Sequence, residues 1–269
     1  MAPSAIKRVR IFAGPNGSGK TTITNIVKDY VNLGEYVNAD DIKVQLVKNR
    51  NIEFNSFHVH LDAEMFIKDL RNSSFAKRID NVDYTISKIH FDGDVLTIDD
   101  DYDVEDYFVS YIASYIWDRL LETSNKFTVE TVMSHRSKLD FMDKAKKMGF
   151  KIYLYFVSLA DPELNKHRVQ TRVAQGGHPV EDAKIVDRYN RTMNYLYEAL
   201  KMADNAYLFD NSYGEPKMFA IKQNGVLDIQ SDYIPAWFEQ YVGNRNDVKE
   251  KKESDNVTNN CNYGKRIIC

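Results

Sequence analysis

A glycine-rich segment near the start of the chain constrains its fold more than any other feature. It reads Gly14-Pro15-Asn16-Gly17-Ser18-Gly19-Lys20-Thr21. The β-branched and aromatic run at residues 9–13, just before it, predicts a strand. Apolar residues follow it at positions 23, 26, 27, 30 and 31, which is the spacing of a helix face. Strand, glycine-rich turn and helix, in this order, predict a phosphate-binding loop (P-loop).

The residue types of this loop suit a nucleoside triphosphate. Glycines let successive backbone N–H groups point inward, and the N-terminus of the helix adds partial positive charge. Lys20 would contact the β- and γ-phosphates, and the Thr21 hydroxyl is suited to coordinate Mg²⁺. We expect the nucleotide to contact Gly14, Pro15, Asn16, Gly17, Ser18, Gly19, Lys20, Thr21 and Thr22.

Length and composition exclude several classes of protein. The 269 residues suffice for one large α/β domain, expected over residues 1–242, with an insertion. The net charge of −3 gives no general attraction to nucleic acid or to an anionic membrane, and the longest apolar stretch, residues 152–160, is too short to span a bilayer. Only Cys261 and Cys269 occur, so no disulfide framework is expected. With the loop so near the N-terminus, a cleaved signal peptide would destroy it, and we expect a cytoplasmic protein.

Strands and helices are predicted to alternate along the chain. Four more strands are expected at residues 36–39, 126–131, 151–157 and 206–209. Helices are expected up to about residue 48, at 137–148 with Gly149 closing the helix, and at about 161–175 and 180–203. The alternation predicts an α/β fold of three layers, a P-loop kinase-like fold with a central parallel sheet.

Residues 50–125 are expected to be an insertion in this fold. It is predicted to begin with a helix at about 57–70 and to contain a hairpin of residues 84–91 and 95–98 about the turn Asp92-Gly93. The acidic run at 99–106 favours a solvated connector over a metal cluster. From residue 243 onward the composition predicts a disordered tail.

An acid after the second strand and an arginine-rich lid are the marks of small-molecule kinases among P-loop proteins. Asp40 and Asp41 follow the second strand, where doubly wound sheets bind ligands. A carboxylate there can accept the proton of a substrate hydroxyl as the γ-phosphoryl group leaves ATP. The alternative is that one of them caps the following helix. We favour Asp40 as the catalytic residue.

The predicted helices at 161–175 and 180–203 form the candidate lid. Arg168 and Arg172 share one face of the first helix, and Arg188 lies beside the apolar stripe of the second, with Arg191 nearly opposite. Arginines on such a pair can neutralise the charge that develops during phosphoryl transfer. Arg172 and Arg188 are the catalytic candidates, and a solvated basic face is the alternative.

An ordered set of motifs resembles the zeta-toxin family. The set consists of the P-loop, Asn38-Ala39-Asp40, Val129-Glu130-Thr131, Arg172-Val173-Ala174-Gln175-Gly176-Gly177-His178, Arg188-Tyr189 and Phe209-Asp210-Asn211-Ser212. Members of that family are ATP-dependent small-molecule kinases, and the toxins among them phosphorylate UDP-N-acetylglucosamine. The resemblance covers roughly residues 7–50 and 126–213.

The resemblance implies a role for each matched residue. Lys20 and Thr21 would hold phosphate and Mg²⁺, and Asp40 would be the general base. Glu130 would bind substrate or the metal shell. Arg172 and Arg188 would be the lid arginines, and Asn211, with Asp210 and Ser212, would lie near the adenine. ATP and Mg²⁺ are the implied cofactors, and a small antitoxin protein is an implied partner.

One departure from the toxin pattern weakens the sugar-nucleotide assignment. In the toxins a Thr and an Arg follow the strand acid, whereas here no arginine follows Glu130 until Arg136. We therefore expect a phosphotransferase acting on a hydroxyl of a small molecule, with a UDP-sugar as one candidate. A polynucleotide or nucleoside kinase is one alternative, which the acidic run at 99–106 disfavours. A non-catalytic ATP-binding regulatory protein is the other.

Overall fold

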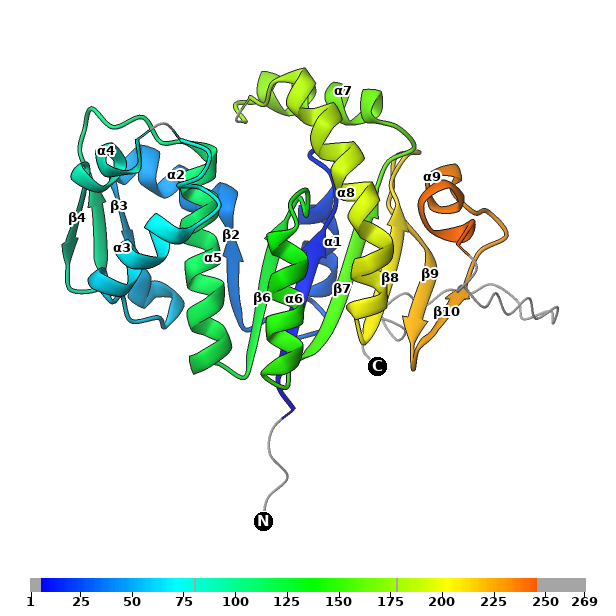
Figure 1. Ribbon diagram of the computed structural model, residues 1–269. Helices are drawn as coiled ribbons and strands as arrows, with labels where there is room; N and C mark the ends of the chain where they lie inside the picture. The colour runs from blue at the N-terminus through cyan, green and yellow to red at the C-terminus, as the bar shows by residue number, and fades with distance from the viewer. Residues whose placement is uncertain (1–5, 80, 178, 246–269) are drawn as a thin grey trace, which may run out of the picture. The chain divides into compact units, whose positions relative to one another are not determined.

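The structure is a computed structural model that describes residues 6–79, 81–177 and 179–245 (Figure 1). These residues form two compact units. The larger unit contains Ile6–Leu33 together with the described residues from 131 onward, and the smaller unit is Gly34–Glu130. The tail predicted from residue 243 lies, from residue 246 on, outside the described residues.

The larger unit is built on a mostly parallel sheet. Its elements in chain order are β1 (Arg8–Ala13), α1 (Lys20–Val27), α6 (Ser137–Lys147), β7 (Lys151–Ser158), α7 (Pro162–Ala174), α8 (Asp182–Met202), β8 (Asn205–Asp210), β9 (Lys217–Gln223), β10 (Val226–Ile229), α9 (Ala236–Phe238) and the π-helical turn η2 (Glu239–Gly243). The strands lie in the order β10-β9-β8-β7-β1. β1, β7 and β8 pair in parallel, and β9 and β10 are added antiparallel.

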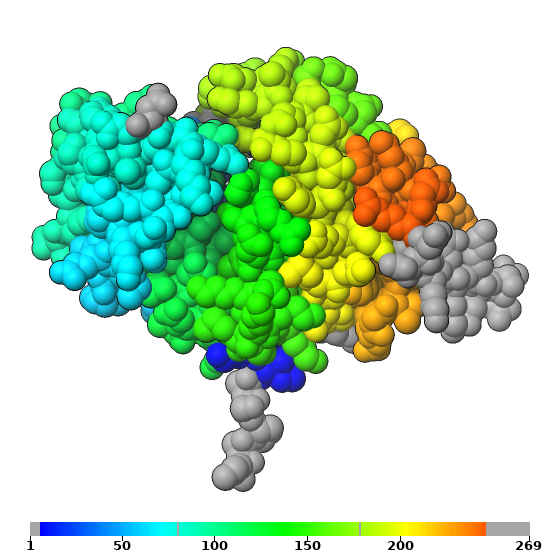
Figure 2. Space-filling view, viewed as in Figure 1, coloured from blue at the N-terminus to red at the C-terminus, as the bar shows by residue number. Residues whose placement is uncertain are grey.

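Helices cover both faces of this sheet. In Figure 1, α1 lies behind the strands, whereas α6 and α8 lie in front of them. In Figure 2 the green surface of α6 and the yellow surface of α8 lie side by side and hide the strands beneath them. Side chains alternate between the two faces of β7. Tyr155 and Val157 pack with Ile23 and Val27 of α1 on one face. Phe156 points to the other face and packs near Trp237 of α9. The predicted α/β fold of three layers is confirmed.

The core beneath α1 aligns the ends of three strands. The rings of Phe12, Tyr155 and Tyr207 stack across β1, β7 and β8, with centroids 4.6 and 5.0 Å apart. In the strand register, Ala13 pairs with Phe156 and Ser158 pairs with Asp210. The loops that leave these three strands therefore start at the same edge of the sheet, where open α/β sheets bind their ligands.

The smaller unit combines two parallel strands with a small antiparallel sheet. Its elements are β2 (Glu35–Asn38), α2 (Ala39–Asn49), β3 (Asn51–Glu53), the 3-10 turn η1 (Phe54–Phe57), α3 (Ala63–Asn72), α4 (Val82–Ser87), β4 (Ile89–Asp92), β5 (Val95–Ile98), α5 (Asp106–Thr123) and β6 (Lys126–Thr131). β2 pairs in parallel with β6, and the other sheet has the order β3-β5-β4. Aromatic rings fill its core, and Phe66 packs edge-on against Tyr111 and Tyr115 of α5.

Several predicted boundaries were wrong. Helix α1 ends at Val27, and Ile26 and Tyr30 of the proposed apolar face are exposed. Residues 84–87 are helical rather than part of a hairpin, because the Asn81 side chain accepts a hydrogen bond from the Tyr84 N–H and starts α4. The first long helix of the insertion begins at residue 63 rather than 57. Helix α5 and the strands β3, β9 and β10 were not predicted.

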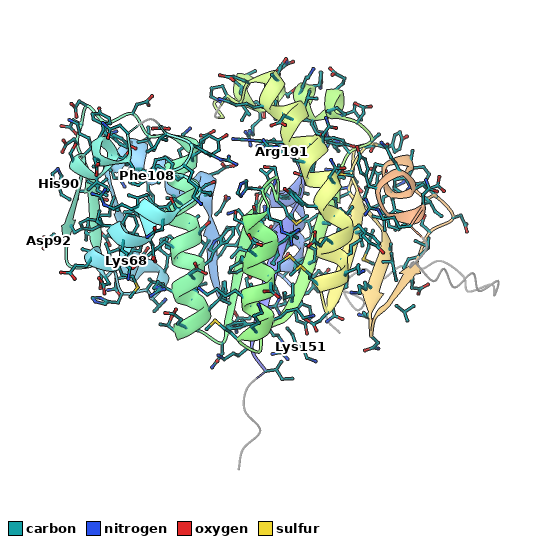
Figure 3. The ribbon with its side chains drawn as sticks, in the orientation of Figure 1. Lys68, His90, Asp92, Phe108, Lys151 and Arg191 are labelled. Carbon is teal, nitrogen blue, oxygen red and sulfur yellow. The ribbon has the colours of Figure 1, made fainter. Side chains whose placement is uncertain are left out.

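The acidic run at 99–106 is partly folded against the smaller unit. Asp99 accepts a hydrogen bond from His90, which is labelled in Figure 3, and also pairs with Lys88. Tyr102, in the middle of the run, is buried. All of its acids except Asp99 are exposed, so the run is a largely solvated connector. Basic side chains pair with four of its six acids, Asp99, Asp100, Asp101 and Asp106. Among the residues that the structure describes, none of the helices has the length and apolarity needed to cross a membrane.

Candidate functional site

The glycine-rich loop curls between the end of β1 and the start of α1. Gly14, Gly17 and Gly19 have φ angles of +146°, +73° and +97°, which side chains rarely allow. A methyl group on Gly14 would lie 2.0 Å from the carbonyl oxygen of Val157 in β7, and one on Gly19 would lie 2.3 Å from Asn211 Nδ2. Only glycine fits these positions, because the loop backbone approaches its neighbours so closely.

Lys20 turns its side chain back into the loop. Its Nζ donates hydrogen bonds to the carbonyl oxygens of Gly14 at 3.0 Å and Pro15 at 3.2 Å. The N-cap of α1 is Gly19, so none of the described side chains caps the first N–H groups of this helix. The lysine charge and the positive end of the helix therefore coincide, as phosphate binding requires. Thr21 is exposed in the first turn of α1, where its hydroxyl can reach Mg²⁺.

Polar atoms around the loop are buried without a hydrogen-bond partner within the described structure. They are Asn16 Oδ1, Ser18 Oγ, Asn165 Oδ1, Asp210 Oδ2 and Asn211 Oδ1. Each such group costs about 1–3 kcal/mol when it is left unpaired. The Ser18 hydroxyl can donate to a phosphate oxygen, whereas the carbonyl and carboxylate oxygens suit hydrated Mg²⁺ or an amino group. Together with the glycine cradle, these atoms fit a bound nucleotide with its metal.

Two side chains fix helix α7 in place, one against the loop and one against the end of β8. Asn165 is buried and donates a hydrogen bond to the carbonyl oxygen of Asn16, and its own backbone carbonyl oxygen lies 2.9 Å from where a methyl on Gly17 would be. Arg168 Nη2 donates to the carbonyl oxygen of Asn211 at 2.6 Å. The helix that the sequence predicts as part of a lid therefore holds both the loop and the end of β8.

The end of β8 also lies against the loop. The Asn211 N–H donates to the Ser158 carbonyl oxygen at the end of β7 at 3.0 Å, and Asn211 Nδ2 donates to the Ser18 carbonyl oxygen at 2.8 Å. Asp210 is buried, and its Oδ1 accepts a hydrogen bond from the Ser212 N–H at 3.0 Å. Asn211 thus joins two strands to the phosphate-binding loop.

Two of the predicted site acids lie together in the smaller unit. Glu130 in β6 is the register partner of Asn38 in β2, and Asp40 follows in the first turn of α2. Glu130 is 6% exposed and accepts a hydrogen bond from the Tyr36 hydroxyl at 2.7 Å. Parallel pairing brings these acids, far apart in sequence, to the same carboxyl edge.

The Asn38 side chain, rather than an aspartate, caps α2. It accepts a hydrogen bond from the Asp40 N–H at 3.0 Å, so the capping role that was the alternative for Asp40 or Asp41 belongs to another residue. Desolvation by the surrounding protein, followed by the negative charge of Asp40, raises the pKa of Asp41. A raised pKa makes a carboxylate a better proton acceptor near neutral pH. Asp41 therefore has to be tested beside Asp40 as a candidate base.

The four arginines of α7 and α8 have different surroundings. Arg172 is exposed near the end of α7, and Arg188 is half-buried in α8. Arg191, labelled in Figure 3, forms an ion pair with Asp187 one turn earlier. Arg168, a lid arginine that was not chosen as a catalytic candidate, contacts the end of β8 as described above. His178, in the break between the two helices, lies outside the described residues.

The segment after β6 has an unusual backbone. Met133 is buried and has a φ of +59°, and its N–H donates to Thr131 Oγ1 at 3.1 Å. Such backbone strain in a residue other than glycine often marks a functional segment. Arg136, the first arginine after the strand acid, forms ion pairs with Asp140 and Glu198. The Arg136 guanidinium is therefore engaged by these two carboxylates.

Sequence reasoning missed Asn165 and gave Arg168 little weight. The available signal was their spacing of three residues, which puts both on one face of a helix that follows the loop-bearing strands. A polar face of a helix usually faces solvent. This spacing alone therefore could not distinguish residues that bind the loop from residues of a solvated face.

None of the known family models matches the chain. An uncharacterized protein of Haemophilus influenzae (strain ATCC 51907 / DSM 11121 / KW20 / Rd) is 32% identical over 63 residues, which are 23% of this chain and 45% of that protein. The chain therefore spans less than half of the length of this curated relative.

Three solved structures have a limited similarity to this chain. The AvrRxo1-ORF1:-ORF2 complex with ATP is 15% identical, with a TM-score of 0.46 over 84% of this chain and 61% of the other. The PezAT chromosomal toxin-antitoxin system of Streptococcus pneumoniae is 15% identical, with a TM-score of 0.45 over 90% and 81%. A gluconokinase from Sinorhizobium meliloti 1021 is 11% identical, with a TM-score of 0.36 over 77% and 84%. This chain is similar to these proteins at a level from which neither a family nor an activity follows.

Proposed function

We propose that the protein is an ATP- and Mg²⁺-dependent phosphotransferase that phosphorylates a hydroxyl group of a small molecule. One observation carries the proposal: the loop between β1 and α1 combines a glycine cradle, the Lys20 ammonium and an uncapped helix N-terminus at one place. The buried polar atoms without partners around the loop add support, because a bound nucleotide and its metal would satisfy them.

In the proposed reaction, the acceptor oxygen forms a bond to the γ-phosphorus of ATP. The bond from that phosphorus to the bridging oxygen of ADP breaks, and the hydroxyl proton passes to Asp40 or Asp41. Lys20 neutralises charge on the β- and γ-phosphates, and Arg172 and Arg188 neutralise the charge that develops on the transferred group. Thr21 would hold Mg²⁺, which supplies charge neutralisation between the phosphates.

The acceptor and the partner rest on the zeta-toxin resemblance. Glu130 is proposed to bind the acceptor, because it is a buried carboxylate at the carboxyl edge of β6. A UDP-sugar is one candidate acceptor, although no arginine follows Glu130 before Arg136. A small antitoxin protein is proposed as partner on the same ground.

The test is transfer of label from γ-labelled ATP in the presence of Mg²⁺. The acceptor panel contains nucleotide sugars, nucleosides and 5′-hydroxyl oligonucleotides, and a reaction without acceptor measures hydrolysis by water. Lys20→Ala is expected to lose ATP binding and turnover together. Asp40→Ala is expected to keep ATP binding and to lose transfer. Asp41→Ala is tested beside it, since it removes the other candidate base.

The outcomes separate the candidate functions. Label on a nucleotide sugar or another small molecule supports the proposal, and label on an oligonucleotide or a nucleoside favours the alternative kinase classes. ATP bound by the wild-type protein, with transfer to none of the panel, would favour the regulatory ATP-binding alternative. Transfer that survives Asp40→Ala but not Asp41→Ala would move the role of the base to Asp41. A wild-type protein that does not bind ATP would overturn the proposal.

A further inference from the structure

Asn165 of α7 is a buried polar residue whose amide serves one backbone group of the phosphate-binding loop. Its side chain is fully buried, and its Nδ2 donates a hydrogen bond to the carbonyl oxygen of Asn16. The amide must face the loop in this way, because its oxygen would repel a carbonyl oxygen. Asn165 Oδ1 therefore points elsewhere, and it has no hydrogen-bond partner within the described structure.

Packing alone does not account for an amide at this position. Val169, one turn later in α7, is also buried against the loop, and its Cγ2 lies 3.2 Å from where a methyl on Gly17 would be. An apolar side chain thus fits this face of the helix, whereas an unpaired buried amide oxygen costs about 1–3 kcal/mol. The hydrogen bond from Asn165 Nδ2 is therefore the feature that needs a reason.

This hydrogen bond fixes the direction of one peptide group of the loop. In a planar trans peptide, the C=O and the following N–H point in opposite directions. Because the Asn16 carbonyl oxygen is turned toward α7, the Gly17 N–H points away from that helix. Among the residues that the structure describes, none accepts a hydrogen bond from the Gly17 N–H. This donor is therefore available to a ligand of the loop.

A second amide holds another peptide group of the loop in the same way. Asn211 Nδ2 donates to the Ser18 carbonyl oxygen at 2.8 Å, which turns the Gly19 N–H away from Asn211. The Gly19 N–H also has no acceptor in the described part of the chain, whereas the Ser18 N–H between them donates to the Pro15 carbonyl oxygen at 3.3 Å. Both peptide groups that an outside amide holds therefore present an unused N–H group.

We propose that Asn165 is a positioning residue for phosphate binding, which holds the peptide between Asn16 and Gly17 with its N–H directed at the triphosphate. This inference rests on the nucleotide binding proposed for the loop and adds a residue of α7 to it. N–H groups that point into a glycine-rich turn form its concave anion site. Gly17 has no side chain to resist rotation of this peptide. Without the Asn165 amide, the Asn16 carbonyl oxygen could turn inward and repel a phosphate oxygen.

The first test measures affinity for tripolyphosphate, which carries the phosphates of ATP without the base. Calorimetry in one Mg²⁺ buffer gives the affinities of tripolyphosphate and ATP for each protein. Asn165→Leu fills the buried space but cannot donate, and Asn165→Ala removes the donor without overpacking. Asp161→Ala is the control, because it weakens α7 by removing its N-cap while the Asn165 hydrogen bond stays in place. Circular dichroism checks that the variants fold.

The second test follows the Gly17 N–H itself by NMR. The chain has only two Asn-Gly pairs, Asn16-Gly17 and Asn224-Gly225, so ¹³C-labelled asparagine with ¹⁵N-labelled glycine isolates two amide signals. Gly225 lies in the turn of the hairpin of β9 and β10 and is the internal reference. The pair Ser18-Gly19 occurs once, so labelled serine isolates the Gly19 signal in the same way.

We expect Asn165→Leu and Asn165→Ala to weaken tripolyphosphate and ATP equally, on the order of 10-fold. Saturating tripolyphosphate should move the Gly17 amide proton downfield in the wild-type protein, because a phosphate oxygen accepts its hydrogen bond. Both variants should lose this movement, while the Gly19 signal still responds to the ligand. Asp161→Ala should bind both ligands as the wild-type protein does.

Wild-type affinities in both Asn165 variants, or a Gly17 movement that survives in both, would overturn the positioning role while leaving the proposed function intact. Equal weakening in Asp161→Ala would overturn it as well, because the effect would then come from a less stable α7. If the wild-type protein bound neither ligand, the nucleotide-binding proposal itself would fail, and this inference with it.

Discussion

The contact between Gly19 and Asn211 gives a direct test of the loop geometry. In Gly19→Ala the new methyl group would lie 2.3 Å from Asn211 Nδ2, so the Asn211 side chain must leave its hydrogen bond to the Ser18 carbonyl oxygen. The left-handed φ of +97° adds strain of its own. About 1–2 kcal/mol for the backbone and about 1 kcal/mol for the hydrogen bond predict a loss of roughly 2–3 kcal/mol in the free energy of unfolding.

The double variant with Asn211→Ala separates these two costs. Asn211→Ala alone removes the same hydrogen bond and should cost about 1 kcal/mol. In the double variant the methyl group added at position 19 no longer meets the Asn211 amide. The hydrogen bond to the Ser18 carbonyl oxygen is already absent, so its free energy is lost only once. We therefore expect a total loss of roughly 2–3 kcal/mol, against roughly 3–4 kcal/mol if the two changes simply added.

Urea unfolding followed by far-ultraviolet circular dichroism measures all three variants. Gly149→Ala is the control, because Gly149 has a φ of +82° and no atom within 4 Å of an added methyl group. It should show the backbone cost alone, about 1–2 kcal/mol. The reasoning is refuted if Gly19→Ala costs no more than Gly149→Ala. It is equally refuted if the Gly19 and Asn211 changes add within about 0.3–0.5 kcal/mol, the scatter of independent sites.

Three further predictions concern single contacts. The raised pKa of Asp41 means that this carboxyl favours the folded state at low pH and that this contribution is lost as pH rises through the folded-state pKa. Asp41→Asn should therefore raise the free energy of unfolding at pH 7, and urea titrations should show the gain vanishing below the ordinary pKa of 3.8. Asp161→Ala removes the N-cap of α7 and should cost about 1 kcal/mol in the same assay. Tyr36→Phe removes a donor from buried Glu130 and should cost about 1.5–3 kcal/mol, less in a Glu130→Gln background.

The phosphate-binding loop and the buried strands could be predicted because their chemistry leaves few alternatives. A glycine-rich turn followed by Lys-Thr fits little besides phosphate binding, and the unbroken apolar run at 151–157 fits a central strand. The hairpin of β9 and β10 could have been predicted as well. Its turn is Asn224-Gly225, with both φ angles positive, and Asn-Gly is the strongest short hairpin signal.

Helix α5 could not be predicted from local preference. Its residues are largely aromatic and β-branched, including Phe108, Val109, Tyr115 and Ile116, and such residues favour strands. Phe108, labelled in Figure 3, is fully buried, and all four side chains are buried in the core of the smaller unit. Burial of both sides of the helix overrides the intrinsic preference of its residues. The same preference made residues 84–87 look like a strand, although Asn81 starts a helix there.

The residues of the candidate site also differ in whether the sequence could predict them. Residues placed by the loop or by strand ends, such as Lys20, Asp40 and Asn211, could be named from the sequence. Residues whose role depends on one tertiary hydrogen bond could not, and Asn165 is the clearest case. Its partner is the carbonyl oxygen of Asn16, and backbone carbonyls carry no sequence signal.

The anchoring of α7 limits how a helical lid could close. Asn165 and Arg168 both bind the phosphate-binding loop or the end of β8, so a hinge at Asp161 that moved α7 as a rigid rod would break both hydrogen bonds. One of these bonds involves a charged donor, and breaking both would cost about 2–4 kcal/mol. Such a cost would leave an open state populated at only a few per cent or less. Arg172 lies one turn beyond the last anchor, and the helix ends before Gly176, whose φ is +92°. Closure that brings Arg172 to the phosphates is therefore expected to use residues 169–177 and to leave the first turns of α7 bound to the loop.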